Sequence, residues 1–225
     1  MPSRQKIKLL RNVAAMPMGG RQSALRERMR RDALALAERE GLGEVACSYR
    51  IVPLDQPVGE TLRLEGETLH APWLLPTSGQ LTALACAVCT VGPTLEARVT
   101  SLFTEKRASL ALALDELGTE LLFAAARLVQ DRMLADTQRQ NLSLSGELHP
   151  GDPGLGLDAH ATVLRLAQAE SIGVTARYGH TLYPLKSSSV VMGAGLDLPP
   201  ATWSRCDRCP SQAKCKLAQR ELAPA

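Results

Sequence analysis

The chain has 225 residues, 45% of them hydrophobic but only 3% aromatic, so one sizeable core would be built mainly from Leu, Ala and Val. No apolar run reaches the roughly 18 residues of a membrane span, and the N-terminus lacks the apolar centre of a secretory signal; we therefore expect a cytoplasmic protein without a membrane partner. The net charge of +3 excludes no class of partner, but nine Lys and Arg against one acid lie in residues 1–31.

This basic segment has two interpretations. It suits contact with an acidic partner, an anionic surface or RNA, or it is simply a solvated helix with a lead-in. No aromatic residue is interleaved with its charges to stack on a base, which disfavours nucleic acid.

The first regular elements follow in order. Apolar residues spaced three and four apart predict a helix over residues 23–40, ended by Gly41 and Gly43. Short alternating runs predict strands over 49–53, 61–65 and 68–71, with a hairpin turn at 65–67.

The strongest helical pattern runs from Leu110 to Leu128. Gly118 inside it predicts a close helix contact, because glycine costs about 1 kcal/mol there relative to alanine. Its acidic residues Asp115, Glu116 and Glu120 could serve acid–base chemistry, but a solvent-exposed face of the helix is the favoured interpretation.

Residues 146–195 are the part of the chain in which we expect a functional site. A polar loop over 141–146 leads into the Pro/Gly loop 149–156, then a helix over 158–169 capped by Asp158 and followed by Gly173. The turn YPLKSSSVVMG at 183–193 follows. Two glycine-containing loops around one helix predict two walls of one site.

The order TVGPTLE, LALDELGTE, PG, SIGV and YPLKSSSVVMG resembles the activation (reactivation) domain of cobalamin-dependent methionine synthase and its stand-alone relatives, over residues 48–195. The resemblance implies an α/β (α+β) fold with a mixed or antiparallel sheet and flanking helices. It also implies a buried strand in 81–91 that leads into a helix. We divide the chain into a basic N-terminal helical segment (1–45), the activation-like domain (46–197) and a Cys-rich tail (198–225).

The resemblance also implies a function. The protein would serve a separately encoded corrinoid-binding homocysteine methyltransferase, most simply a split methionine synthase, whose inactive cobalamin is reduced by one electron and remethylated from S-adenosylmethionine. Flavodoxin or ferredoxin is the implied kind of electron donor. The chain would be a component of methyltransferase activation, without catalytic residues of its own.

The implied binding residues lie in the two loops: His149, Pro150, Gly151, Asp152, Tyr183, Lys186 and Ser187. In the family the first loop reads Arg-x-x-Pro-Gly-Tyr, and its Arg and backbone hold S-adenosylmethionine. Aligning Pro150-Gly151 puts Glu147 at the Arg position and Asp152 at the Tyr position, so an anion replaces the cation that would bind the methionine carboxylate. Lys186 is the candidate replacement.

The cysteines give a separate prediction. Cys206, Cys209 and Cys215 have the spacing of three ligands of a zinc or iron–sulfur site, one short of closure. Redox thiols and inert cysteines remain open alternatives. Cys86 and Cys89 lie in apolar sequence and are expected to be core thiols. A metal-stabilised adaptor that contacts an acidic partner or RNA is therefore the alternative function.

Overall fold

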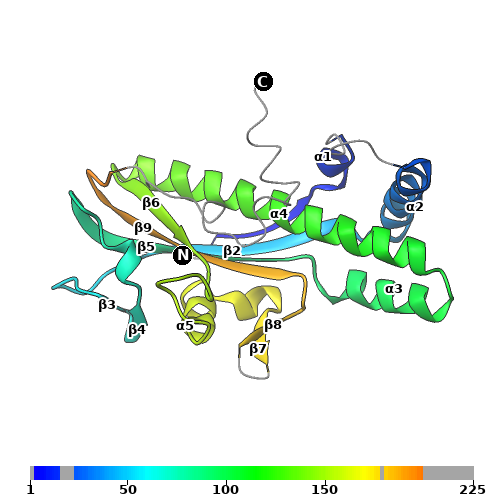
Figure 1. The fold of residues 1–225 in the computed structure, drawn as a ribbon. Coiled ribbons are helices and arrows are strands. Elements are labelled where there is room, and N and C mark those ends of the chain that lie inside the picture. The colour runs from blue at the N-terminus through cyan, green and yellow to red at the C-terminus, as the bar shows by residue number, and fades with distance from the viewer. Residues whose placement is uncertain (1–2, 16–22, 178–179, 200–225) are drawn as a thin grey trace.

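A five-stranded antiparallel sheet forms the centre of the fold in the computed structural model, which describes residues 3–15, 23–177 and 180–199 (Figure 1). Its strands lie in the order β1 (Ser3–Lys8), β2 (Glu44–Pro53), β5 (Gln80–Thr90), β9 (Ser187–Leu196) and β6 (Ser143–Leu148). Every pairing in this sheet is antiparallel. Because β1 and β6 are the edges, β2, β5 and β9 are interior strands.

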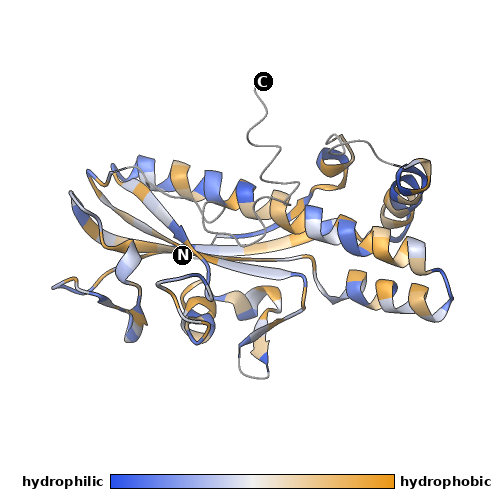
Figure 2. Ribbon diagram, in the orientation of Figure 1, coloured by the Kyte–Doolittle hydropathy of each residue, from blue (hydrophilic) through white to orange (hydrophobic). Residues whose placement is uncertain are grey.

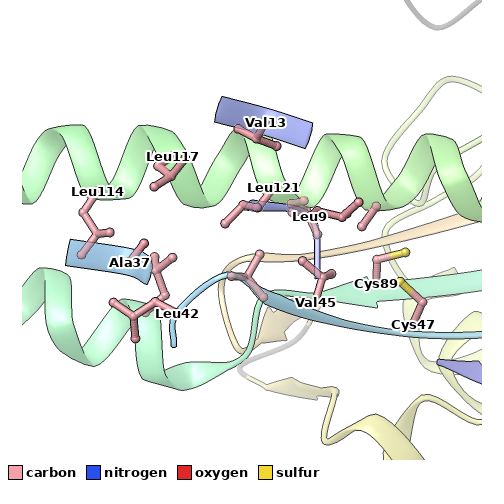
Figure 3. Close-up of a cluster of buried hydrophobic side chains, with 14 of the residues drawn as sticks. Leu9, Val13, Ala37, Leu42, Val45, Cys47, Cys89, Leu114, Leu117 and Leu121 are labelled. Carbon is pink, nitrogen blue, oxygen red and sulfur yellow. The ribbon is translucent and has the colours of Figure 1, made fainter. Parts of the chain in front are cut away.

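Helix α4 (Ala108–Arg139) lies along one face of the sheet, and α1 (Leu10–Ala15), α2 (Ala24–Glu40) and α3 (Pro93–Thr104) pack against α4 towards one end of the sheet (Figure 1). Apolar and hydrophilic residues alternate along α4 (Figure 2), whose Leu114, Leu117 and Leu121 are buried. They belong to one core with Val45 and Leu9 from the sheet side (Figure 3). An amphipathic helix of this length is held by such packing more than by its intrinsic propensity.

The opposite face carries smaller elements: α5 (Ala159–Leu166), the 3-10 helices η1 (Pro72–Leu74) and η2 (Ala169–Ile172), the hairpin β3–β4 (Thr61–Leu64, Glu67–His70) and the hairpin β7–β8 (Thr175–Arg177, Thr181–Tyr183). A second core lies there, with Leu84 and Val191 from the sheet and Val163 from α5. The central strands are thus buried on both faces, which explains why residues 81–91 are almost uniformly apolar.

Several sequence predictions are confirmed. The first predicted helix is α2, where Ser23 Oγ accepts the N–H of Arg26 at 3.2 Å and Gly41 ends the helix at φ 68°. The turn at 65–67 joins β3 to β4. The contact expected at Gly118 is with α3, because a Cβ on Gly118 would lie 2.8 Å from Leu95 Cδ2. The antiparallel α+β architecture is also as expected.

Two segments expected to be loops are strands. Much of the polar loop predicted over 141–146 belongs to β6, where the small and polar run SLSGEL pairs with β9 and anchors at the buried Leu148. Most of the predicted turn 183–193 is β9. Its serines looked like loop residues, but Ser187, Ser188 and Ser189 pair with β5, and only the later part of β9, from Val191 on, also pairs with β6.

Asp158 does not cap α5 as predicted. Its side chain makes no capping hydrogen bond, and its backbone is helical at φ −61° and ψ −24°. The helix is also shorter than expected: it ends at Leu166, and Gly173 ends η2 instead. The left-handed conformation of Gln168, at φ 53°, separates the two helices.

The basic N-terminal segment is built into the fold rather than only solvated. Residues 3–8 form strand β1, which pairs with β2. Arg26 contacts Glu116, and Arg30 Nη1 lies 2.7 Å from Glu120 Oε2, with the two side chains of this second pair 14% and 16% exposed. The expected solvated acidic face of α4 is therefore partly a seam of ion pairs with α2. Among the described residues, no helix is both long and apolar enough to cross a bilayer.

Candidate functional site

The loop between β6 and α5 is held in a compact turn by its own backbone. The Asp152 N–H donates to the His149 carbonyl at 2.8 Å, and the Gly151 N–H donates to the Leu155 carbonyl at 2.8 Å. Asp152 Oδ2 in turn accepts the His149 N–H at 2.8 Å. Gly151 has φ 100°, which an L side chain rarely adopts. The Pro150-Gly151 turn predicted from the sequence is therefore rigidly shaped, and Asp152 folds back to stabilise it.

Trp73 of η1 forms the support of this loop, a role that the sequence did not suggest. A Cβ on Gly154 would lie 2.6 Å from Cγ and 2.8 Å from Cδ2 of the Trp73 ring. Gly154 also has φ 86°. Glycine is required here twice over, once for the backbone conformation and once for the close approach of the ring. Trp73 and Gly154 lie some 80 residues apart, and no local sequence pattern predicts that they touch.

Electrostatically, the loop carries no side-chain cation other than histidine: residues 149–158 contain no Lys or Arg. Glu147 Oε1 lies 2.9 Å from His149 Nε2, and the His149 side chain is 10% exposed. At the position that the sequence resemblance aligns with the family's arginine, the structure therefore has a carboxylate next to a histidine. The described residues of the loop do not provide the cation that would bind the carboxylate of S-adenosylmethionine.

His160 of α5 interacts electrostatically with His149 of the loop and with His180, the residue before β8. Burial lowers the pKa of His160, and the charges of His180 and His149 lower it further, while a hydrogen bond with the His180 backbone opposes the shift. His160 Nδ1 and Ser189 Oγ are buried, and neither has a hydrogen-bond partner among the described residues. The pairing of β6 with β9 ends at Leu148 and Val191, where the loop begins, and Ser189 lies two residues before Val191 on β9. These two atoms are available to a polar ligand or to water.

Lys186 is directed away from this loop. Lys186 Nζ donates to Asp115 Oδ2 at 3.0 Å and to Thr119 Oγ1 at 2.8 Å, so it joins the start of β9 to α4 on the opposite face of the sheet. Ser187 Oγ lies 2.8 Å from Thr90 Oγ1 and 2.6 Å from the Pro184 carbonyl oxygen. The structure therefore groups His149, Pro150, Gly151 and Asp152, holds Lys186 on α4, and pairs Ser187 with Thr90 and Pro184. Their binding roles stay predictions.

Tyr183 lies at the end of β8, in the hairpin that also packs on α5. The guanidinium of Arg177 stacks on its ring, with Cζ 3.7 Å from the ring centroid. This cation–π contact occupies one face of the ring and one of the few cations near α5. Contact between Tyr183 and a ligand stays a prediction.

The described residues contain no group of three or more His, Cys, Asp or Glu placed to hold a metal. Cys206, Cys209 and Cys215 lie outside the described residues, so their metal site remains a prediction. Cys86 and Cys89 are buried as expected. Burial raises the pKa of the Cys86 thiol to about 12, and the pKa of Cys89 is raised by a hydrogen bond with Cys47 and by burial. These thiols are protonated members of the core.

Comparisons with known proteins support the fold. No family model matches the chain, and no curated protein matches it significantly. Among solved structures, it is similar to the crystal structure of the MetH reactivation domain bound to AdoHcy, with a TM-score of 0.65. The likeness covers 88% of this chain and 80% of that chain at 12% sequence identity. The chain therefore has a fold like that of the MetH reactivation domain, which confirms the sequence-based resemblance at the level of the fold.

Proposed function

We propose that this chain docks on a separately encoded corrinoid protein, most simply the cobalamin-binding part of a split methionine synthase, and supports the reductive remethylation of its cobalamin. The observation that carries the proposal is the fold, which resembles a MetH reactivation domain crystallised with AdoHcy. The order of sequence motifs along residues 48–195 supports the same assignment independently of the coordinates.

The β6–α5 loop is the part of the chain to which the proposal assigns ligand contact. Its turn is fixed by the Gly151 and Asp152 hydrogen bonds and by Trp73 beneath it, so little conformational entropy would be lost when a ligand binds. His160, which interacts electrostatically with His149 of the loop, and Ser189 add buried polar atoms without a partner among the described residues. In this role the chain's own residues orient a ligand and exclude water from it, while the chemistry belongs to the partner's cobalamin.

S-adenosylmethionine is the methyl donor that the proposal assigns, and the loop sets an expectation for its affinity. A carboxylate at Glu147 repels the methionine carboxylate, where an arginine would attract it. We therefore expect weak binding, measured by calorimetric titration with S-adenosylmethionine and with AdoHcy. If the chain binds a cobalamin-loaded protein but neither ligand gives a heat of binding, the chain has only a docking role.

The tail cysteines Cys206, Cys209 and Cys215 form a separate part of the proposal. They would hold an iron–sulfur cluster or zinc, and with a cluster the chain would itself relay the electron from a flavodoxin- or ferredoxin-type donor. Protein purified without oxygen is then brown or contains stoichiometric zinc, and Cys209→Ser loses the metal. A colourless, metal-free protein would contradict this part and leave the docking role intact.

Deletion of the gene tests the biological role. In a strain whose methionine synthesis depends on cobalamin, the deletion is expected to produce methionine auxotrophy during aerobic growth, when cob(II)alamin accumulates. Normal growth would count against the proposal. Salt-dependent RNA binding with no affinity for a cobalamin-loaded protein would instead favour the adaptor function.

A further inference from the structure

Strand β1 is an edge of the main sheet with one side open among the described residues. The Leu9 N–H donates to the Gly43 carbonyl, at the position that continues the β1–β2 register beyond Lys8 and Glu44. In an antiparallel pair the residues alternate, so the odd-numbered residues of β1 bond to β2. The backbone N–H and C=O groups of Arg4, Lys6 and Lys8 therefore point to the open edge.

The same three residues carry the exposed side chains of the strand, since Ser3, Gln5 and Ile7 are half-buried on the alternate positions. Ile7 packs on the core beneath α4, so Arg4, Lys6 and Lys8 face the side of the sheet that holds α5. Lys6 Nζ lies 2.8 Å from Glu44 Oε1. Arg4 and Lys8 make no hydrogen bond or ion pair with any described residue. Along the open edge of β1, the residues whose backbone N–H and C=O groups lack a strand partner in the described part of the chain are therefore the same residues that carry the cationic side chains.

A hollow of about 720 Å³ adjoins this row at Arg4. Its wall is apolar where Leu164 of α5 meets Val174 and Ala176 near β7, and it carries Glu170 on its rim. Arg165, also in the wall, is already paired with Glu67 at 2.6 Å. The volume is within the range of about 300–1,000 Å³ usual for ligand clefts. Because the charges of Arg4 and Glu170 in the lining offset each other and Arg165 is already paired, the hollow suits an uncharged side chain.

We propose that the open edge of β1 binds an extended acidic segment of a partner protein as an added strand. Backbone hydrogen bonds to Arg4, Lys6 and Lys8 give affinity, and carboxylates at every second residue of the segment pair with the three cations. At the Arg4 end, the next residue of the segment on this same face is apolar and enters the hollow. A second copy of β1 is excluded as the occupant, because it would set like charges opposite one another. This surface is distinct from the β6–α5 loop and does not depend on the proposed function.

The test uses the full-length protein and a labelled peptide, Leu-Val-Glu-Val-Glu-Val-Glu-Val-Leu, which places three Glu and a terminal Leu on one face of the strand in either orientation. Binding is followed by fluorescence anisotropy. The expected result is binding of this peptide but not of a peptide of the same composition in which the three Glu residues are consecutive. The double variant Arg4→Glu/Lys8→Glu is expected to weaken binding at least about tenfold, because two attractive pairs become repulsive. The matched control Arg31→Glu/Arg63→Glu changes the net charge equally at exposed sites elsewhere and is expected to change affinity less than about twofold.

Two more variants separate the backbone and hollow contributions. Lys6→Pro removes an N–H that faces the open edge, where proline is tolerated, and it is expected to bind more weakly than Lys6→Ala, which loses only the charge. Ala161→Trp fills the hollow from the exposed face of α5 and is expected to weaken binding. Circular dichroism confirms that each variant is folded.

Four results would overturn the proposal: equal binding of both peptides, equal losses in the two charge-reversal variants, equal affinities of Lys6→Pro and Lys6→Ala, or unchanged affinity of Ala161→Trp. Binding of a single-stranded RNA oligonucleotide in place of the peptide, lost in Arg4→Glu/Lys8→Glu, would also overturn it.

Discussion

Replacing Gly154 with alanine tests whether Trp73 is the support of the β6–α5 loop. Gly154 has φ 86°, and its missing Cβ would lie 2.6 Å from Trp73 Cγ. The left-handed backbone costs an alanine about 1–2 kcal/mol. Carbon atoms in contact lie about 3.5–4.0 Å apart, so the ring must also move by about 1 Å, which adds about 1–3 kcal/mol. We expect Gly154→Ala to lower the free energy of unfolding by about 2–5 kcal/mol.

The matched control is Gly173→Ala. Gly173 has φ 75°, but its Cβ would meet nothing within 4 Å, so this variant carries only the backbone cost. Urea unfolding of both variants at 25 °C gives the difference, which we expect to be about 1–3 kcal/mol. In a Trp73→Ala background that difference should vanish, because the ring is gone. Equal costs for the two glycine variants in the wild-type background would refute the contact.

Three further predictions follow from the described contacts. Glu147→Arg is expected to tighten S-adenosylmethionine binding by about tenfold in calorimetry, whereas Glu170→Arg, with the same charge change outside the loop, should leave it unchanged. The pKa of His160 is lowered in the folded state, so the unfolded chain takes up a proton at this residue first as the pH falls through about 6.5. The protein should therefore lose stability on acidification. Urea unfolding between pH 7.5 and 5.5 should show this loss, and the loss should be smaller in His160→Gln. Arg30→Ala leaves a mostly buried carboxylate unpaired and should cost about 2–4 kcal/mol in urea unfolding, against at most about 0.5 kcal/mol for Arg28→Ala, whose ion pair is exposed.

The fold was predictable where one physical signal dominates. The apolar stripe of α4 and the almost uniformly apolar residues 81–91 must be buried, which indicates a packed helix and a central strand. Ser23 and Gly41 mark the ends of α2 because they are typical capping residues. Strand β6 was missed because it is a short edge strand of small and polar residues. Its place is decided by pairing with β9, which no local pattern of residues encodes.

The candidate site was predictable only in its local part. The Pro150-Gly151 turn depends on neighbouring residues, so the loop could be expected from the sequence. Lys186 and Asp115 are 71 residues apart, and their ion pair across the sheet could not be foreseen from either segment. The same holds for Trp73 beneath Gly154, since both contacts depend on how the sheet is assembled.

The most direct test of the proposed function is a spectroscopic reactivation assay. A homocysteine methyltransferase from the organism that encodes this chain is loaded with cob(II)alamin and mixed with S-adenosylmethionine and a chemical reductant, with and without the protein. Our account predicts that the protein accelerates the conversion of the cob(II)alamin spectrum to that of methylcobalamin, in proportion to its concentration up to one equivalent. An identical rate without the protein would contradict the account.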